Sequence, residues 1–177
     1  FMFCDVSRVF THELVRHRVG VAISQESLRY VRLEDLGLWI PSCYVKITKS
    51  VELFEAAFAT MESFYNSLIL DAAEYETGVR SEEAFTKLPF EKKKEYTSAA
   101  RRLVPDGIST NIGWSCNMRT LRHVIEMRTS PGAEEEIRLV FGKVAEMAVQ
   151  KWPHLFGDYQ IEIVNDLPWY KTEHRKV

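Results

Sequence analysis

The longest regular pattern in this sequence is a run of apolar residues at helical spacing between Ser50 and about Glu76. These residues recur every three or four positions and stop before Gly78, which predicts one long amphipathic helix. A second, more highly charged helix is expected in EKKKEYTSAARRLVPDG, where the turn at 105–107 would end it. Two helices of this kind commit much of the chain to helical structure.

Shorter elements are expected before and after these two helices. FMFCDVS alternates as a strand does, and ISTNIGWSC is expected to form another strand. Three more helices are predicted, over about 8–18 with Ser7 as its cap, from Asn117 to about Arg128, and from Pro131 to about Gln150 with Ser130 as its cap. Residues 21–29 are expected to form a loop, and the tail from Ile161 a strand with a solvated end. The pattern predicts an α+β fold, helix-rich with a small mixed or antiparallel sheet, in a single domain over residues 1–177.

Composition argues against several classes of protein. The 177 residues, 46% of them hydrophobic, can bury one substantial core, and a net charge of −2 gives no basic field that would attract nucleic acid. The three cysteines lie far apart without metal-ligand spacing, so we expect no disulfide framework, no metal site and a reduced, cytoplasmic compartment. No apolar run approaches the roughly 20 residues of a membrane span. The chain opens on Phe1 in the middle of a pattern, so we expect an N-terminal part of the domain to be missing.

A cluster of cations precedes a polar turn in RHRVGVAISQESLRY, residues 16–30. On a helix, Glu13 would share a face with Arg16 or His17. Arginine forks beside hydroxyls and loop N–H groups are typical of a site that holds a phosphate. The alternative is a solvated helix end whose arginines are placed favourably near its C-terminus. The residues alone leave both interpretations open.

A second set of cations lies further along the chain. It consists of Arg101, Arg102, Arg119, Arg122, His123 and Arg128. Their neighbours Trp114 and Cys116 indicate a partly buried setting, where an unpaired arginine would be costly, so a ligand phosphate is one candidate partner. The alternative is a set of surface cations paired with Glu126 or with the acidic run 134–136.

These segments together resemble the flavin-dependent thymidylate synthase family. Arg16-His17-Arg18 followed by Ser27 resembles its Arg-His-Arg, seven residues, Ser signature, and SLRY resembles the Ser-x-Arg-Tyr ending. ARRLVP is similar to the family's Ala-Arg-x-x-x-Pro segment, and NMRTLRHVIEMR to its Asn-x-Arg-Ser-Leu helix. The three blocks stand in the family's order within residues 1–150.

The resemblance implies the fold, reaction and partners of that family. The reaction is reductive methylation of dUMP to dTMP, with FAD as cofactor and 5,10-methylenetetrahydrofolate and NADPH as cosubstrates. The resemblance also implies a cytoplasmic homotetramer whose active sites are shared between subunits, with no nucleic acid or membrane as partner.

The resemblance further assigns roles to individual residues. Those implied to contact FAD are Arg16, His17, Arg18, Asn117, Arg119 and His123. Those implied to contact dUMP are Glu13, Gln25, Glu26, Ser27, Leu28, Arg29, Arg101 and Arg128, with Arg101 reaching in from another subunit. The catalytic residues implied are Arg128, Arg16 and Ser27. Arg128 would grip the uracil and stabilise negative charge on the ring, and Ser27 would bind phosphate.

Departures from the family pattern keep alternatives open. Eight residues, not seven, separate Arg18 from Ser27, Glu13 stands where the family usually has glutamine, and His123 where it usually has asparagine. One alternative is a pyrimidine-nucleotide C5-methylase that acts on UMP, and another is a non-catalytic flavin- or nucleotide-binding relative. Cys116 is interpreted as a core thiol in preference to a nucleophile.

Overall fold

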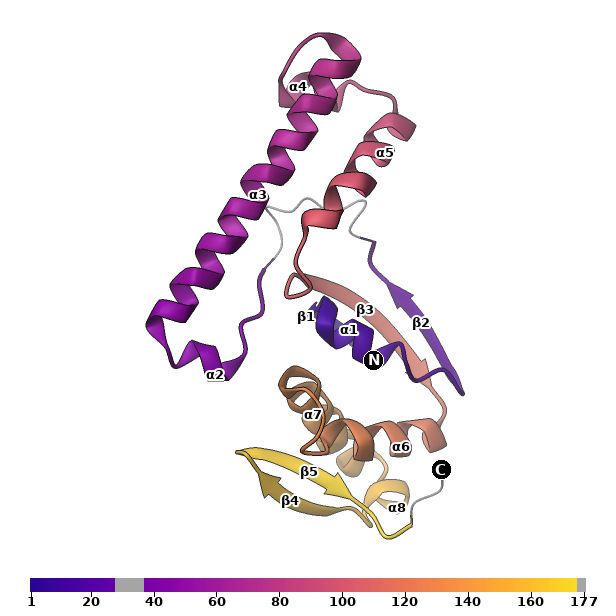
Figure 1. Ribbon diagram of the computed structural model, residues 1–177. Helices are drawn as coiled ribbons and strands as arrows, with labels where there is room; N and C mark the ends of the chain where they lie inside the picture. Colours follow the sequence, from indigo (N-terminus) through magenta and orange to yellow (C-terminus); the bar gives the residue numbers. More distant parts are fainter. Residues whose placement is uncertain (28–36, 175–177) are drawn as a thin grey trace. The chain divides into compact units, whose positions relative to one another are not determined.

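The computed structural model describes residues 1–27 and 37–174. The chain forms two compact units, the first made of Phe1–Ser24 and the chain from Asn111 onward, and the second of Gln25–Thr110 (Figure 1). The helix-rich α+β class is confirmed, while a single catalytic domain over 1–177 stays a prediction. None of the described helices combines the length and the apolarity needed to cross a membrane.

A three-stranded sheet is formed by β1 (Met2–Ser7), β2 (Val21–Gln25) and β3 (Ser109–Cys116), in the order β1-β3-β2, and most of its residues belong to the first unit. Phe1 and Trp114 exchange two main-chain hydrogen bonds of 2.8 and 2.9 Å, as antiparallel neighbours do. The two predicted strands are therefore confirmed. The prediction of a loop over 21–29 is wrong for 21–25, which form a strand. This segment is little buried and is extended because it pairs with β3, so its sequence shows no hydrophobic alternation that would predict a strand.

Aromatic side chains fill the core of the first unit. Phe3, Phe10, Trp114 and Phe141 are all buried, and their ring centroids lie 5.2–6.4 Å apart in the contacting pairs. They bring together β1, β3, the short helix α1 (Arg8–Leu14) and the longer helix α7 (Glu135–Lys151). This core fixes the end of α1, where the Arg-His-Arg segment begins.

Helix α1 starts as predicted and ends earlier. The Ser7 hydroxyl accepts a hydrogen bond from the Phe10 N–H (3.0 Å), which confirms the N-cap. The helix stops at Leu14 and not at Arg18, because the His17 N–H bonds the Leu14 carbonyl (3.1 Å) and leaves the Glu13 carbonyl to the Arg128 side chain (2.7 Å). A contact from a distant helix thus ends α1, which no local signal could predict.

Helix α6 (Met118–Thr129) follows β3 and carries four members of the second cationic set, namely Arg119, Arg122, His123 and Arg128. The Asn117 side chain accepts from the Thr120 N–H (2.9 Å), so the predicted cap and start are confirmed. Helix α7 begins at Glu135 and not at Pro131, which corrects the expected Ser130 cap. A turn closed by Ala133 N–H to Ser130 O (3.0 Å) comes first, and the Glu134 carboxylate caps the helix instead.

A β-hairpin follows the short helix α8 (Pro153–Phe156) at the end of the first unit. Its strands are β4 (Gln160–Val164) and β5 (Leu167–Lys171), where a single strand was expected. Asn165 and Asp166 both have positive φ (54° and 60°), which fits a two-residue type I′ turn. The buried Arg138 donates to Val164 O (2.8 Å) and to Thr129 O (3.3 Å), so it ties the hairpin to the end of α6.

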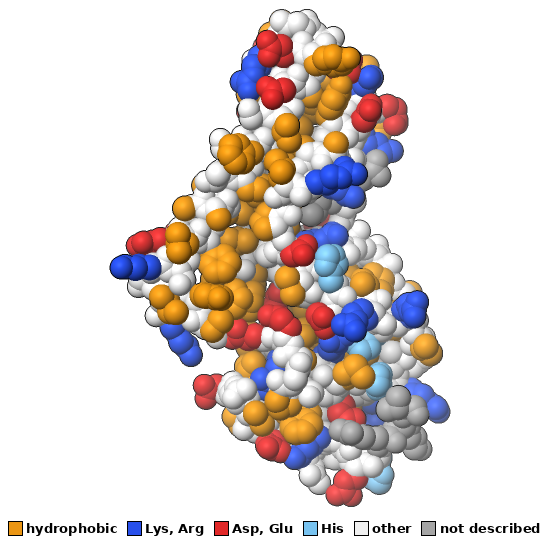
Figure 2. All heavy atoms as spheres, in the orientation of Figure 1, with side chains coloured by type: hydrophobic (Ala, Val, Ile, Leu, Met, Phe, Trp, Pro, Cys, Tyr) orange, Lys and Arg blue, Asp and Glu red, His pale blue; other side chains and the backbone are white. Residues whose placement is uncertain are grey.

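The second unit is built on α3 (Thr48–Thr77), which confirms the predicted long helix. The smaller elements around it are α2 (Ser42–Val45), α4 (Glu82–Thr86), α5 (Phe90–Ala100) and the 3₁₀ turn η2 (Arg101–Leu103). Tyr65, Ala100 and Ile108 are buried between them. Figure 2 shows that many hydrophobic side chains along α3 nevertheless remain at the surface.

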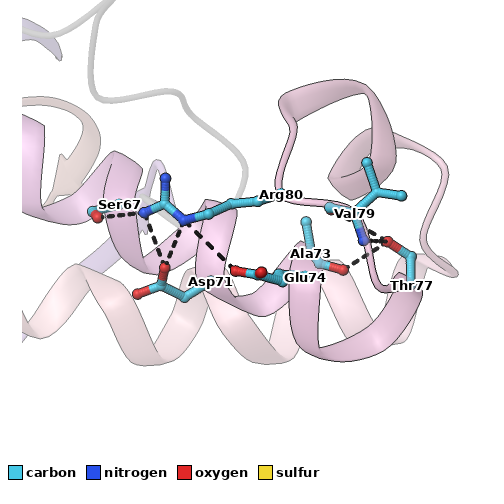
Figure 3. Close-up of polar contacts among 7 residues, drawn as sticks. All are labelled: Ser67, Asp71, Ala73, Glu74, Thr77, Val79 and Arg80. Carbon is cyan, nitrogen blue, oxygen red and sulfur yellow. Dashed lines mark hydrogen bonds and ion pairs between the residues drawn. The ribbon is translucent and has the colours of Figure 1, made fainter.

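The C-terminal end of α3 is closed by polar contacts (Figure 3). The helix ends at Gly78 (φ 75°), and Arg80 folds back to donate to Asp71 Oδ1 (3.1 Å) and Ser67 Oγ (2.9 Å). The Thr77 hydroxyl donates to Ala73 O (2.8 Å) and accepts from the Val79 N–H (3.2 Å). Because the Arg80 pair is exposed, it directs the turn more than it stabilises the unit.

Candidate functional site

The guanidinium of Arg128 is the centre of a polar cluster in the first unit. It is 7% exposed and donates from Nε to His17 Nε2 (2.7 Å) and from Nη2 to the Glu13 carbonyl oxygen (2.7 Å). Its Nη1 pairs with the Glu13 carboxylate. These bonds join the end of α6 to the end of α1, so two segments that the resemblance assigned to the site are brought together.

His17 is held neutral in this cluster. Burial, together with the positive charges of Arg128, His123 and Arg16, lowers the pKa of His17 to about 4. Since an arginine Nε always carries its proton, His17 Nε2 must be the acceptor and Nδ1 the protonated nitrogen. The His123 ring lies against it, with centroids 6.0 Å apart. A proton carrier at neutral pH needs a pKa near 7, so this geometry favours a positional role for His17 over that of a proton carrier.

Glu13 contacts a second arginine as well. One of its carboxylate oxygens lies 3.4 Å from Arg16 Nη1, although Arg16 follows the end of α1 and does not share a helix face with Glu13. The Arg16 side chain is 70% exposed, whereas that of Arg128 is almost fully buried. The negative charge of Glu13 is therefore balanced by two cations, one inside the unit and one at its surface.

The turn that follows the Arg-His-Arg segment is attached to the N-terminus of α6. The Asn117 N–H donates to Gly20 O (3.0 Å), and the Thr120 hydroxyl donates to Val19 O (2.8 Å). Gly20 has φ +67°, and a Cβ placed there would lie 2.1 Å from Asn117 Nδ2. Only glycine fits this close approach. The contribution of Gly20 and Thr120 was not foreseen, although a glycine two residues after the motif was a usable signal.

Two further arginines flank this attachment. Arg18 precedes Val19 and Arg119 precedes Thr120, and both side chains are exposed. Among residues 1–27 and 37–174, neither guanidinium forms a hydrogen bond or an ion pair. Two exposed guanidinium forks, one from the turn attached to α6 and one from the first turn of α6, are a donor set that suits a pyrophosphate or another dianionic group.

Arg122, by contrast, has a protein partner. It forms two bonds of 2.7 Å with the Asp158 carboxylate and lies over the Tyr159 ring, 5.0 Å from its centroid. The Arg122 guanidinium holds the pKa of the Asp158 carboxyl well below its usual range. Asp158 therefore neutralises Arg122, and no ligand phosphate is needed as its partner.

Cys116 behaves as a core thiol. Burial raises its pKa to about 11, so it stays protonated near neutral pH and is a poor nucleophile.

The described part of the chain holds no group of three or more His, Cys, Asp or Glu side chains placed to bind a metal ion.

The remaining predicted site residues lie elsewhere in the chain. Gln25, Glu26, Ser27 and Arg101 belong to the second unit, and Arg101 is exposed at the end of α5. Leu28 and Arg29 lie outside the described residues. The roles assigned to all of these side chains stay predictions.

The fold and the cluster define an α+β protein with an arginine-rich site suited to an anionic ligand. A family model, "Thymidylate synthase complementing protein" (Thy1), matches residues 1–154, and the chain belongs to this family. The flavin-dependent thymidylate synthase of Corynebacterium glutamicum is 35% identical to it over 161 residues, which are 91% of this chain and 61% of that protein. The enzyme of the same name from Mycolicibacterium vanbaalenii is 30% identical over 166 residues, with 63% of its length covered. The chain thus spans less than two thirds of these relatives.

One solved structure shares the fold. It is the flavin-dependent thymidylate synthase ThyX of Helicobacter pylori, complexed with FAD and dUMP. The two structures superpose with a TM-score of 0.55 and share 18% sequence identity. The matched region covers 89% of this chain and 70% of the Helicobacter pylori chain. At this identity the likeness supports the fold alone.

Proposed function

We propose that this protein is a flavin-dependent thymidylate synthase. It would methylate dUMP to dTMP with 5,10-methylenetetrahydrofolate as the carbon donor and NADPH as the reductant. The observation that carries the proposal is the Arg128 cluster, in which the Arg-His-Arg segment and α6 meet on one buried guanidinium. Family membership and the names of the relatives point to the same reaction.

Arg128 is the group proposed to activate the pyrimidine. Uracil C5 becomes a nucleophile only if negative charge can develop on the ring, and a fixed cation stabilises that charge better than a mobile one. Arg128 is fixed by Glu13 and His17 and retains N–H bonds for a ligand. Arg16, with its exposed side chain, would help to close the nucleotide site. The nucleotide phosphate and sugar would meet Gln25, Glu26, Ser27, Leu28, Arg29 and Arg101.

FAD would be held by Arg16, His17, Arg18, Asn117, Arg119 and His123. The unpaired guanidiniums of Arg18 and Arg119 fit its pyrophosphate, and the neutral His17 retains an N–H at Nδ1 that it can donate. When bound, FAD supplies the electrons for the reductive step. The role of the protein is to bind and orient it beside the nucleotide.

The protein is also proposed to form a homotetramer in the cytoplasm. Leu53, Phe64, Leu68 and Tyr75 are all exposed on α3. Their spacing places them within a stripe of about 60° on the helix surface, here called the α3 stripe. An apolar stripe of this length on a long helix is suited to contact with another copy of the chain, which would also bring Arg101 to a shared site. The three free cysteines suit a reducing compartment.

An anaerobic assay tests the proposed reaction. The FAD-loaded protein is given methylenetetrahydrofolate and NADPH with dUMP or UMP, and the nucleotide product is followed by mass spectrometry. We expect dUMP to gain a methyl group. Methylation of UMP alone would replace the proposal with a UMP methylase. Flavin binding without methylation of either nucleotide would overturn it in favour of a non-catalytic relative.

A further inference from the structure

Arg128 has little freedom left in its guanidinium. An arginine carries five N–H bonds, and three of those of Arg128 are taken by Glu13 and His17. One N–H therefore remains on each terminal nitrogen. A ligand can accept hydrogen bonds only from these two N–H groups. Their direction depends on the three hydrogen bonds that Arg128 already forms with Glu13 and His17.

Glu13 holds both terminal nitrogens of Arg128. Its carboxylate pairs with Nη1 and its main-chain carbonyl accepts from Nη2 (2.7 Å). The carbonyl is available because α1 ends at Leu14 and the His17 N–H bonds Leu14 O. The early end of the helix and the acidic side chain thus act on the same guanidinium.

The carboxylate of Glu13 is already engaged on both of its oxygens. One oxygen pairs with the buried Arg128 and the other lies 3.4 Å from Arg16. A carboxylate is also a poor neighbour for a nucleotide phosphate, since two negative charges repel each other. Direct contact with the substrate, the role implied by the family resemblance, is therefore not what this geometry favours.

We propose that Glu13 is a positioning residue, which acts on the substrate through Arg128 and does not touch the nucleotide itself. It fixes the plane of the guanidinium so that the two remaining N–H bonds meet one ligand. Arg128 in turn fixes the Nδ1–H form of His17 through its bond to Nε2. The identity of the ligand as dUMP is taken from the proposed function, and to that extent this inference rests on it.

A double-mutant cycle on dUMP binding separates the two roles. The dissociation constant of dUMP is measured by calorimetry for the FAD-loaded wild type, Glu13→Ala, Arg128→Lys and the double variant. In the wild-type background we expect Glu13→Ala to weaken dUMP binding about tenfold, which is the scale of one lost bond to a charged group. In the Arg128→Lys background, which lacks the guanidinium fork, the same substitution should weaken binding less than about twofold. Glu13→Gln keeps an acceptor for Nη1, so it should bind within about threefold of the wild type. An equal loss in both backgrounds would show that Glu13 contacts the nucleotide and would overturn the proposal.

A matched variant controls for simple loss of stability. Asp158→Ala removes the carboxylate partner of Arg122, which forms another arginine–carboxylate pair on α6. It should lower the melting temperature as Glu13→Ala does and leave dUMP binding unchanged. A parallel loss of binding in Asp158→Ala would assign the effect of Glu13 to stability, against the proposal.

A measurement without nucleotide or flavin tests the same contact. The ¹⁵N NMR spectrum of His17 distinguishes its two neutral forms, and we expect the Nδ1–H form in the wild type and in Glu13→Gln. Glu13→Ala should weaken this preference, because Arg128 loses its carboxylate bond and is then held only by the main-chain carbonyl of residue 13 and by His17. An unchanged spectrum would overturn the proposal even if the protein bound no dUMP, whereas failure of the wild type to bind dUMP would count against the proposed function alone.

Discussion

At the scale of single residues, His17 couples the site to pH. Its pKa is about 4 in the folded protein because of burial and nearby positive charges, against about 6.5 in an unfolded chain. As the pH falls below 6.5, the unfolded chain takes up the proton first. The stability that His17 contributes is thus complete above pH 6.5 and is lost progressively towards pH 4.

We therefore expect the free energy of unfolding to fall with pH between 6.5 and 4 more steeply in the wild type than in His17→Asn. Asparagine retains an acceptor for Arg128 and does not titrate. Urea unfolding at several pH values measures both slopes, and the comparison cancels other groups such as Glu136, whose pKa is raised by burial. Replacement of the exposed His154 by Asn is the control and should leave the slope unchanged. Identical slopes for the wild type and His17→Asn would contradict the neutral His17.

The chemistry proposed for Arg128 predicts that no cysteine is needed. Cys116 is protonated and half-buried, so Cys116→Ala should keep kcat/KM for dUMP within about threefold of the wild type. Arg128→Lys keeps the charge but loses the fork, and should lower kcat/KM by about 10²-fold, the scale of one lost charge-stabilising donor. Rates of dTMP formation measure both. A large loss in Cys116→Ala with a small loss in Arg128→Lys would favour cysteine chemistry instead.

At the scale of elements, the attachment of the Arg-His-Arg turn to α6 depends on glycine. Gly20→Ala would introduce a Cβ at a positive φ and 2.1 Å from Asn117 Nδ2, so we expect a loss of about 1–3 kcal/mol in the free energy of unfolding. Gly132→Ala is the matched control, because a Cβ there meets nothing within 4 Å and its φ is not positive. Denaturant unfolding compares the two variants. Equal stabilities would argue against the close contact at Gly20.

The elements that could be predicted from the sequence are those whose signals are local. The caps of α1 and α6 depend on Ser7 and Asn117, each of which bonds an N–H three residues away. The end of α1 could not be predicted, because it is set by Arg128, more than a hundred residues along the chain. The strand β2 likewise depends on β3. The hairpin β4–β5 was within reach, since Asn165 and Asp166 form a recognisable two-residue turn.

At the scale of the whole molecule, the site is assembled from segments that are far apart in the sequence. Pattern and resemblance proposed Arg16, His17 and Arg128 as site residues, but did not predict the direct bonds of Arg128 to His17 and Glu13. Spacing along one helix gives only the faces of that helix, so a contact between two helices has no sequence signature. For the same reason the sequence could not distinguish Arg122, which pairs with Asp158, from the arginines that are proposed to bind a ligand.

The α3 stripe predicts how copies of the chain associate. Phe64 is 60% exposed near the middle of the stripe, and a buried apolar contact there would be broken by a charge. We expect light scattering during gel filtration to give the mass of four 20.6-kDa chains for the wild type and a smaller species for Phe64→Glu. Asn66→Glu adds the same charge to an exposed position on the far side of α3 and should remain a tetramer. If Phe64→Glu eluted with the wild type while Asn66→Glu dissociated, the opposite face of α3 would be the contact between subunits.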